Sequence, residues 1–462
     1  GPQGGVVKRG EATIKTRGGV TTVRQGGQKV VIDWRSFDID PDEAVRFLQP
    51  NSDAIALNRV LDALPTHIKG KLNANGNVWI VNRHGIVIHA GALIDVGGLL
   101  ASTADITDDD FMAGRYAFSI PGAPGARVVN RGQITFGDKG LAGLVGPGAE
   151  NRGVIQGKLG TVMVGGAETF AVDMAGDGLF AFQLSGDQAQ AMNAGRIVNE
   201  GGRVAVTAAA ASALVDSAVS MDGVIVADSF GGTVGEVTVD GGAGGTSVAG
   251  AISARGAQAG EAGGKVSILG GAVEVTKTAS IDVSGRTTGG EALILGSESL
   301  RYFGSTLASA PFGGGFVETS APVITIDGSV MASNGLWVID PDDVRIFSGA
   351  AALPQEVDAD DIALALKGGT SVEVHTDHGG ADVGTLTVED GLDALEIDDG
   401  FSPTLSLRAH DAIILQSGAG GGIAQNFDPG SGLGGTLSVS LGGPVNPGGG
   451  DVTVARTAVF ND

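Results

Sequence analysis

A short motif returns along this chain at a regular spacing. Asparagine, any residue, glycine, any residue and then isoleucine form Asn130-Arg131-Gly132-Gln133-Ile134, and the same or a closely similar run fills 151–155 and 193–197. The second copy follows the first by 21 residues, and the third follows by 42, which is twice that spacing. Such a period predicts a solenoid, because one coil cannot bury its apolar face alone and must stack on its neighbours. Asparagines at equivalent places in stacked coils, here Asn130, Asn151 and Asn193, are expected to form a ladder of side-chain amides.

Glycine pairs continue the repetition further along the chain. They begin at residues 201, 231, 263, 289 and 314, at steps of 30, 32, 26 and 25. Between them lie runs of about four residues rich in Val and Ile and bounded by Gly, Asn or Asp, which is typical of strands and turns. We expect the pairs to turn the corners with positive φ angles. The predicted fold is all-β, a right-handed parallel β-helix whose first open edge is covered by an N-terminal cap over 6–31.

The sequence indicates helices and domain boundaries less clearly. The segments 52–63, 208–214 and 360–366 are the helix candidates, the last with an aspartate in capping position. Residues 338–400 hold 16 Asp and Glu against 2 Lys and Arg, and the glycine pairs stop there. We therefore expect a cap and first coils over 1–110, further coils over 111–335 and a smaller acidic β-rich module over 336–462.

Composition excludes several classes of protein. The chain has 462 residues, no cysteine and a formal net charge of −23. Disulfide scaffolds, thiol catalysis and zinc ribbons are therefore excluded, and nucleic acid is not an expected partner because its phosphates would be repelled. No run of 18 apolar residues is present, so no transmembrane helix is predicted. The first residues show neither the basic nor the apolar region of an intact signal peptide.

The segment from residue 30 onward is more specific than composition. Val30-Val31-Ile32-Asp33-Trp34-Arg35-Ser36-Phe37-Asp38-Ile39 is followed by Phe47-Leu48-Gln49-Pro50-Asn51-Ser52 and by Ile68-Lys69-Gly70-Lys71-Leu72-Asn73-Ala74-Asn75-Gly76-Asn77-Val78-Trp79-Ile80-Val81-Asn82. This closely resembles the secretion domain of two-partner-secretion exoproteins, the filamentous-haemagglutinin-like family. The opening at 4–14 fits the start of that domain, and the segment 336–344 looks like one found downstream in such proteins.

The resemblance implies how the chain leaves the cell and what reads it. Its implied location is the medium or cell surface of a Gram-negative bacterium, reached through the periplasm. Its implied partner is a cognate outer-membrane transporter of the TpsB type, whose periplasmic domains recognise the secretion domain. The family's Asn-Pro-Asn-Gly-Ile turn falls on 82–86, where Asn82, Gly85 and Ile86 match and two residues depart. Asn58 and Arg59, which we expect to fix a turn or cap a strand and which have a smaller chance of contacting the transporter, complete the predicted recognition set.

Acidic clusters at 105–110, 340–343 and 398–399 are candidates for calcium, because carboxylate oxygens are its preferred ligands, and six residues of the first two clusters are the predicted ligands. Solvated acidic turns are the simpler interpretation, so no cofactor is predicted apart from calcium as an option. The six residues are Asp108, Asp109, Asp110, Asp340, Asp342 and Asp343.

Several other side chains can be interpreted either as structural or as functional. Asp173 and Asp177 lie within one coil length, as the paired carboxylates of a polysaccharide-active enzyme would. Trp34 and Trp79 are expected in the core, although either could be a platform for sugars. Two histidines are too few to define a metal or haem site, so surface positions are the simpler interpretation. The six histidines are His67, His84, His89, His375, His378 and His410.

The sequence thus predicts a secreted, non-enzymatic exoprotein. The N-terminal part is expected to be recognised by the transporter and to nucleate folding of the β-helix. The β-helix is expected to present an adhesive surface to a host-cell or matrix receptor, either glycan or protein. The alternatives are a β-helical polysaccharide-active enzyme and the N-terminal part of a secreted toxin or haem-acquisition protein.

Overall fold

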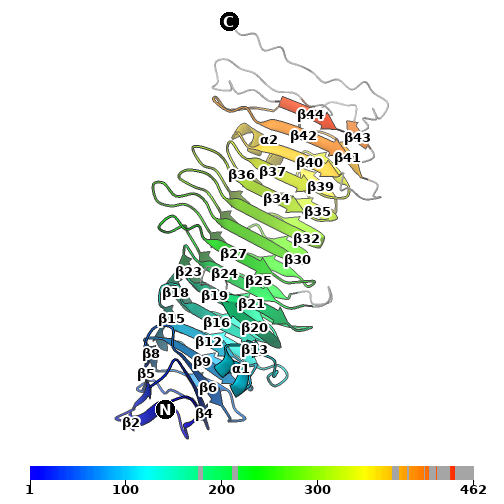
Figure 1. Cartoon of the computed structure of the whole chain (residues 1–462). Coiled ribbons are helices and arrows are strands. Elements are labelled where there is room, and N and C mark those ends of the chain that lie inside the picture. Colours follow the sequence, from blue (N-terminus) through cyan, green and yellow to red (C-terminus); the bar gives the residue numbers. More distant parts are fainter. Residues whose placement is uncertain are drawn as a thin grey trace. The chain divides into compact units, whose positions relative to one another are not determined.

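The protein is described by a computed structural model that covers residues 1–174, 180–210, 217–376, 384–392, 395–409, 412–415, 423 and 438–442. The chain divides into two compact units, Gly1–Thr246 and Ser247–Asp462. Both are built almost wholly of strands, as Figure 1 shows. Each unit is described by itself below.

Unit one is wound from three ladders of parallel strands (Figure 1). The first ladder is β4 (Lys29–Trp34), β6 (Ile55–Val60), β9 (Asn77–Asn82), β12 (Gly98–Ser102), β16 (Leu141–Gly146), β19 (Thr161–Gly166), β24 (Arg203–Ala208) and β27 (Glu236–Asp240). The second is β7 (Thr66–Ile68), β10 (Ile86–Ile88), β14 (Arg127–Asn130), β17 (Gly148–Asn151), β22 (Gln190–Asn193) and β25 (Val219–Met221). The third is β3 (Val20–Gln25), β5 (Ala44–Leu48), β8 (Lys71–Ala74), β11 (Leu93–Val96), β15 (Gln133–Phe136), β18 (Val154–Lys158), β23 (Arg196–Glu200) and β26 (Val224–Val226). Each coil contributes strands to these ladders, which confirms the predicted parallel β-helix.

Antiparallel strands precede the first coil. Strand β1 (Val6–Arg9) pairs antiparallel with β4, and β2 (Ala12–Arg17) forms a hairpin with β3. The hairpin turns on Gly18 and Gly19, whose φ angles of 56° and 76° favour glycine. These strands cover the beginning of the first and third ladders, at the position predicted for the cap.

Stacked glycines let neighbouring coils approach closely at one corner. A Cβ on Gly153 would lie 2.1 Å from the carbonyl oxygen of Gly132, and one on Gly195 would lie 2.2 Å from that of Gly153. The glycine of the repeated motif is therefore required by contact between coils. The same reason holds for Gly290, where a Cβ would lie 2.0 Å from the oxygen of Gly264. The expectation of positive φ at the glycine pairs is correct at residues 201, 231 and 232 but wrong at the pairs from residue 263 onward.

A small antiparallel sheet lies against the first ladder of unit one. It consists of β13 (Tyr116–Phe118), β20 (Thr169–Met174) and β21 (Phe180–Ser185). Phe118 stacks on Phe170 with ring centroids 4.5 Å apart, and Tyr116 meets Trp79 edge-on at 4.8 Å. Trp79 and Trp34 are 0% and 1% exposed, which confirms that they belong to the core.

Unit two also contains three ladders of parallel strands. The first two share the long strands β30 (Lys265–Val275) and β32 (Glu291–Tyr302). The first contains β30, β32, β34 (Phe316–Ser320), β37 (Leu336–Asp340), β40 (Ser371–Thr376), β42 (Thr404–Ala409) and β44 (Ser438–Gly442). The second contains β30, β32, β35 (Val323–Ile326), β39 (Glu356–Asp358), β38 (Val344–Phe347), β41 (Thr385–Val388) and β43 (Ala412–Leu415). The third contains β29 (Ala251–Ser253), β31 (Ser280–Asp282), β33 (Ser305–Leu307) and β36 (Ser329–Met331). The parallel pairing of β34 with β37 runs through residue 336, and the predicted divisions at 110 and 335 stay predictions.

The helix predictions have mixed outcomes. Helix α2 (Ala359–Lys367) confirms the candidate at 360–366, and the Asp358 side chain caps it by accepting a hydrogen bond from the Asp360 amide. The candidate at 52–63 is wrong, because it contains β6, which pairs with β4 on one side and β9 on the other. The Ala-rich candidate at 208–214 begins at the end of β24, and its residues 211–214 lie outside the described residues. Helix α1 (Asp108–Ala113) was not predicted.

Candidate functional site

The turn at residues 82–86 joins β9 to β10. The Gly85 amide donates to the Asn82 carbonyl at 3.0 Å, and the His84 amide donates to the Asn82 Oδ1 at 2.9 Å. The Asn82 amide group in turn donates to the Leu64 carbonyl and to the Thr66 hydroxyl. Gly85 has a φ of 119°, which a side chain would strain. Hydrogen bonds of the buried Asn82 side chain thus fix the conformation of the turn.

Exposure divides this turn into a hidden and an accessible part. Asn82 and Ile86 are fully buried, whereas Arg83 and His84 are exposed. A partner that docks on the folded turn therefore meets Arg83 and His84, the two positions that depart from the family pattern. Asn82 and Gly85 set the shape that presents them.

Asn58 and Arg59 lie within β6 and not at a turn, so the expectation that they fix a turn or cap a strand is wrong. Asn58 points to the inside of the coil. It is fully buried in β6, its Oδ1 accepts from the Trp34 indole at 2.9 Å, and its amide group donates to the carbonyls of Ala56 and Trp79. These bonds satisfy a polar group that would otherwise be costly to bury. They link β4, β6 and β9 from the interior, so Asn58 is out of reach of a partner in the folded chain.

Arg59 joins three carboxylates from different elements. Its guanidinium lies 2.9 Å from each of Asp33 on β4, Asp105 after β12 and Asp108 on α1, and it also donates to the Ile106 carbonyl at 2.8 Å. The side chain is only 14% exposed. Burial acts to lower the pKa of Arg59, but the charges of Asp105 and Asp108 outweigh it and raise that pKa. The predicted recognition pair is therefore an internal hydrogen-bonding residue and an ion-pair hub that holds α1 against the first ladder.

The three repeated asparagines form an amide ladder in the second strand ladder. The Asn130 amide donates to the Asn151 Oδ1 at 2.8 Å, and the Asn151 amide donates to the Asn193 Oδ1 at the same distance. All three side chains are fully buried. The ladder ends on the sulfur of Met221, 3.3 Å from the Asn193 amide nitrogen.

The predicted calcium residues near 108–110 do not converge on a common point. They occupy the first turn of α1, where Asp108 pairs with Arg59, Asp109 with Arg9 and Asp110 with Arg115. Negative charge is favourable at a helix N-terminus, and each of the three carboxylates already forms an ion pair with an arginine. The structure therefore gives these carboxylates a structural role.

The second acidic set lies at the end of β37 and in the turn before β38. Asp340 lies 3.1 Å from the His375 imidazole, and Asp343 accepts from the Thr385 amide at 2.8 Å. Neither this set nor Asp108–Asp110 contributes to the group of three possible metal ligands found among the described residues. Calcium binding there stays a prediction.

That group is Asp327, Asp358 and Asp361, which the sequence did not single out. Their carboxylate oxygens lie within 4.8 Å of one another, between β35, β39 and α2. The Asp361 Oδ2 is buried without a hydrogen-bond partner among the described residues. Burial, followed by the charges of Asp358 and Asp327, raises the pKa of Asp361 to about 7. The Asp361 carboxyl in this cluster is therefore still protonated at mildly acidic pH.

The histidines pair in an unexpected combination. His67 on β7 and His89 after β10 meet across neighbouring coils, with Nδ1 and Nε2 2.9 Å apart and both rings half-buried. Burial and the positive charges of His67 and Lys69 lower the pKa of His89. His84 is exposed, and His375 pairs with Asp340. His378 and His410 lie outside the described residues.

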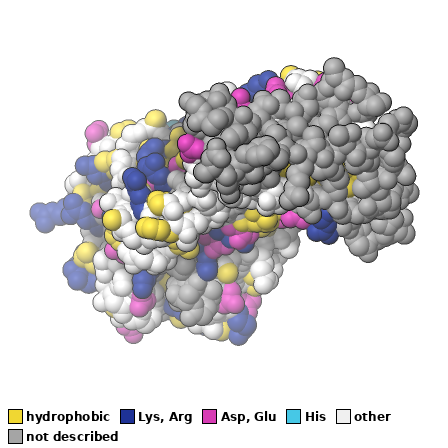
Figure 2. Space-filling view, turned by 90° about the horizontal axis from the view of Figure 1, so that it is seen from above, with side chains coloured by type: hydrophobic (Ala, Val, Ile, Leu, Met, Phe, Trp, Pro, Cys, Tyr) yellow, Lys and Arg dark blue, Asp and Glu magenta, His cyan; other side chains and the backbone are white. Residues whose placement is uncertain are grey.

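The carboxylate pair singled out for polysaccharide chemistry is only partly described. Asp173 is exposed on β20, and Asp177 lies outside the described residues. On the face in Figure 2, charged side chains of both signs are scattered among apolar and uncharged ones. Within the described ranges, no helix has the length and apolar character needed to cross a bilayer.

Comparison with known proteins decides the family. A family model described as "TPS secretion domain" matches residues 1–268. The chain belongs to the two-partner-secretion (TPS) family. Its strand ladders also resemble the crystal structure of the HMW1 secretion domain from Haemophilus influenzae, with a TM-score of 0.63 and 22% identity over 96% of this chain and 100% of that one.

Two relatives match a shorter stretch. Both are heme/hemopexin-binding proteins of Haemophilus influenzae, the second from strain ATCC 51907 / DSM 11121 / KW20 / Rd. They are 44% identical over 111 and 105 residues, or 24% and 23% of this chain. The matching stretch spans 12% of the length of each relative.

Family membership fixes the route of this TPS chain. A TPS exoprotein is secreted by a Gram-negative bacterium through the periplasm and across the outer membrane, where a cognate TpsB-type transporter recognises its secretion domain. The predicted route and the predicted transporter are thus confirmed, and the host-cell or matrix receptor stays a prediction. The residues that the transporter contacts stay a prediction.

Proposed function

We propose that the cognate transporter recognises the chain through the turn at residues 82–86 and the Arg59 hub, and that the secreted β-helix adheres to glycans or cells. The match of the secretion-domain family over residues 1–268 carries this proposal. The proposal assigns no catalytic activity to the chain. A screen for reducing ends or unsaturated sugars released from acidic polysaccharides tests that part, and reproducible release would contradict it.

The turn supports recognition by its shape. Buried Asn82 and the positive φ of Gly85 hold Arg83 and His84 outward. The double variant Asn82→Ala/Gly85→Ala is expected to lose secretion, because it removes the Asn82 side-chain bonds and strains the positive φ at residue 85. The double variant Arg83→Ala/His84→Ala keeps both features and removes the exposed side chains, together with the bond from the Arg83 Nε to the Pro121 carbonyl.

Binding and secretion separate the two contributions. The whole chain and both double variants are titrated with the purified periplasmic domains of the transporter, and secretion is followed as the share of chain in the culture medium. Loss in both variants places recognition on the tip of the turn. Full secretion by the Asn82/Gly85 variant would contradict the proposed role of the turn.

Adhesion is tested with a glycan array and with cells, in calcium and in EDTA. Calcium-dependent binding would assign the acidic clusters a role, and calcium-independent binding would point to the strand faces. No binding to any glycan or cell would overturn the adhesive part of the proposal.

Haem acquisition is the second candidate function. It is favoured by the names of the two relatives and by the half-buried pair His67 and His89, whose imidazoles are ligands of the type that haem iron takes. Titration of haem into the chain would shift the Soret band, and His67→Ala/His89→Ala would abolish the shift. An unchanged Soret band would remove this candidate.

A further inference from the structure

The charge of the cap opposes that of the whole chain. The first 35 residues hold two carboxylates, Glu11 and Asp33, in a chain whose net charge is −23. Over the same stretch there are seven cationic residues: Lys8, Arg9, Lys15, Arg17, Arg24, Lys29 and Arg35. A local excess of cations in an acidic protein directs an anionic partner to that place.

Strand register gathers several of these cations on one side of the third ladder. In register, Lys15 faces Thr22 and Thr22 faces Arg46, while Arg17 faces Val20 at the head of a row that reaches Lys71 through Ala44. Side chains alternate between the two faces of a sheet, and those in these rows point outward. Lys15, Arg17, Arg24, Arg46 and Lys71 are all exposed and are called here the basic face.

None of the five members of the basic face forms an ion pair within the described residues. The nearest carboxylates on its side of the sheet are Glu11, just before β2, and Asp95 on β11. Asp42 and Glu43 lie in the turn before β5, and Glu43 pairs with the amino terminus. Charges on an edge strand can serve to prevent aggregation, which would account for Lys15 and Arg17 on β2. That reason does not apply to Arg24, Arg46 and Lys71, which lie on inner strands.

The basic face ends at an open strand edge. Strand β2 pairs with β3 and with no other described strand. In a two-residue hairpin the residues next to the turn exchange hydrogen bonds and the pattern then alternates, so Ala12, Ile14 and Thr16 direct their backbone N–H and C=O groups to the free side. These groups are a template for another strand.

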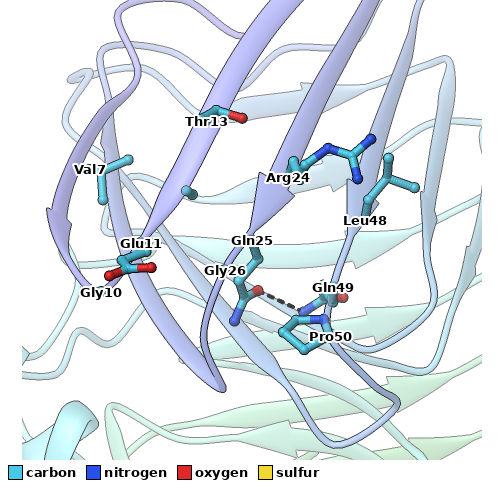
Figure 3. Close-up of a pocket in the computed structure, with 11 residues that line it drawn as sticks. Val7, Gly10, Glu11, Thr13, Arg24, Gln25, Gly26, Leu48, Gln49 and Pro50 are labelled. Atoms are coloured by element: carbon cyan, nitrogen blue, oxygen red, sulfur yellow. Dashed lines mark hydrogen bonds between the residues drawn. The ribbon is translucent and has the colours of Figure 1, made fainter.

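A groove adjoins the same strands (Figure 3). Its volume is about 600 Å³. Figure 3 shows Val7 and Glu11 on one side and Arg24 and Leu48 on the other, with Gln25 bonded to Gln49 on the floor between them. Arg24 belongs to both the groove and the basic face. The groove therefore offers apolar contact at the end of a surface that is otherwise cationic.

We propose that an acidic, extended segment of a partner protein binds here by adding a strand to the free edge of β2. Backbone hydrogen bonds to Ala12, Ile14 and Thr16 would hold it. Its side chains at every second residue lie on the side of the basic face, opposite Thr13, Lys15 and Arg17 at the separation of cross-strand neighbours. The segment recognised thus carries Asp or Glu at alternate positions. This goes beyond the proposed function, because it concerns the cap rather than the turn at 82–86.

Three labelled decapeptides test the proposal against the full chain by fluorescence anisotropy at low salt. The first has Glu at alternate positions separated by Val and Thr. The second has the same sequence with N-methyl groups on the backbone amides that would face β2. The third has the same composition with all Glu residues contiguous. The first peptide is expected to bind about tenfold more tightly than the other two, because only it combines strand pairing with charge register.

Protein variants locate the binding. Lys15→Glu/Arg17→Glu is expected to weaken the first peptide about tenfold, since two attractive cross-strand pairs become repulsive. Arg131→Glu/Arg196→Glu makes the same charge change at exposed positions of later coils and is expected to leave binding unchanged. Circular dichroism confirms that both variants fold.

Several outcomes would overturn the proposal. Equal affinity for the three peptides, or absence of binding, would remove strand addition. Heparin or phosphatidylglycerol vesicles that bind the chain while the first peptide does not would assign the basic face to a polysaccharide or a lipid surface instead. An equal loss of affinity in both charge variants would show that only net charge matters.

Discussion

At the scale of single residues, Asn151 is the middle of the amide ladder. Its Oδ1 accepts from Asn130 and its amide group donates to Asn193, and all three are fully buried. Asn151→Ala leaves two buried polar groups without partners, at about 1–3 kcal/mol each. The free energy of unfolding, measured with urea, is therefore expected to fall by about 2–6 kcal/mol.

The matched control is Gln156→Ala on the next strand, β18. The Gln156 side chain faces outward and bonds the Thr135 hydroxyl at 3.0 Å, where water can replace it. This variant is expected to cost less than about 1 kcal/mol. Equal losses of unfolding free energy in the two variants would mean that the amide ladder stabilises the fold no more than an outward-facing hydrogen bond does.

Arg59 is the second residue whose loss is predictable. Arg59→Lys keeps the charge but cannot reach Asp33, Asp105 and Asp108 together, because an ammonium lacks the planar fork of donors. A loss of about 2–3 kcal/mol in the free energy of unfolding is expected, below the cost of about 3–5 kcal/mol for removing one partner of a buried pair, because lysine keeps the charge. Urea unfolding of the variant measures it, with Arg131→Lys, an exposed position, as control. A neutral result would show that water replaces the guanidinium.

At the scale of elements, helix α2 carries a predicted pH dependence. The folded pKa of Asp361, about 7, lies above its ordinary value of 3.8, so the folded state binds this proton more tightly than the unfolded state. The stability from this group is complete below about pH 4 and is lost as the pH rises through 7. Asp361→Asn is expected to flatten that decline and to add about 1–2 kcal/mol at pH 8, reduced from the full shift because the group is partly exposed.

Thermal unfolding between about pH 4 and pH 8 measures this effect. Asp360→Asn is the control, since Asp360 lies next in the chain but is exposed. It is expected to leave the slope nearly unchanged. A wild-type chain whose stability rises between pH 5 and pH 7 while Asp361→Asn stays flat would contradict the raised pKa.

Elements also show what the sequence could and could not predict. The spacing of Asn130, Asn151 and Asn193 predicted stacked coils, because local repetition and register between coils coincide there. Segment 52–63 looked helical from its apolar spacing, but pairing on both sides of β6 outweighs local propensity. The sequence could not predict that His67 pairs with His89 or that Asp327, Asp358 and Asp361 cluster. Coil lengths vary, so sequence spacing alone does not determine which residues of neighbouring coils are in register.

At the scale of the whole molecule, secretion and the absence of cysteine belong together. A chain that crosses a transporter before it folds must pass as a single strand, and each disulfide would close a loop that doubles the width. Thr135 and Gln156 face outward and are in register on β15 and β18. Parallel neighbours about 4.8 Å apart are within reach of a disulfide. The double variant Thr135→Cys/Gln156→Cys therefore places a cross-link where the fold accepts it.

The oxidising periplasm is expected to close this bond before transport, so the double variant should accumulate there. Added reductant should restore its release to the medium, and each single cysteine variant should be secreted like the parent chain. Immunoblots of periplasm and medium, run with and without reductant, measure the two pools. Release of the oxidised double variant at the parental rate would mean that coils form before the chain leaves the cell. The β-helix would then not be built by coils that stack one after another, at the repeated Asn and Gly positions, as the chain emerges.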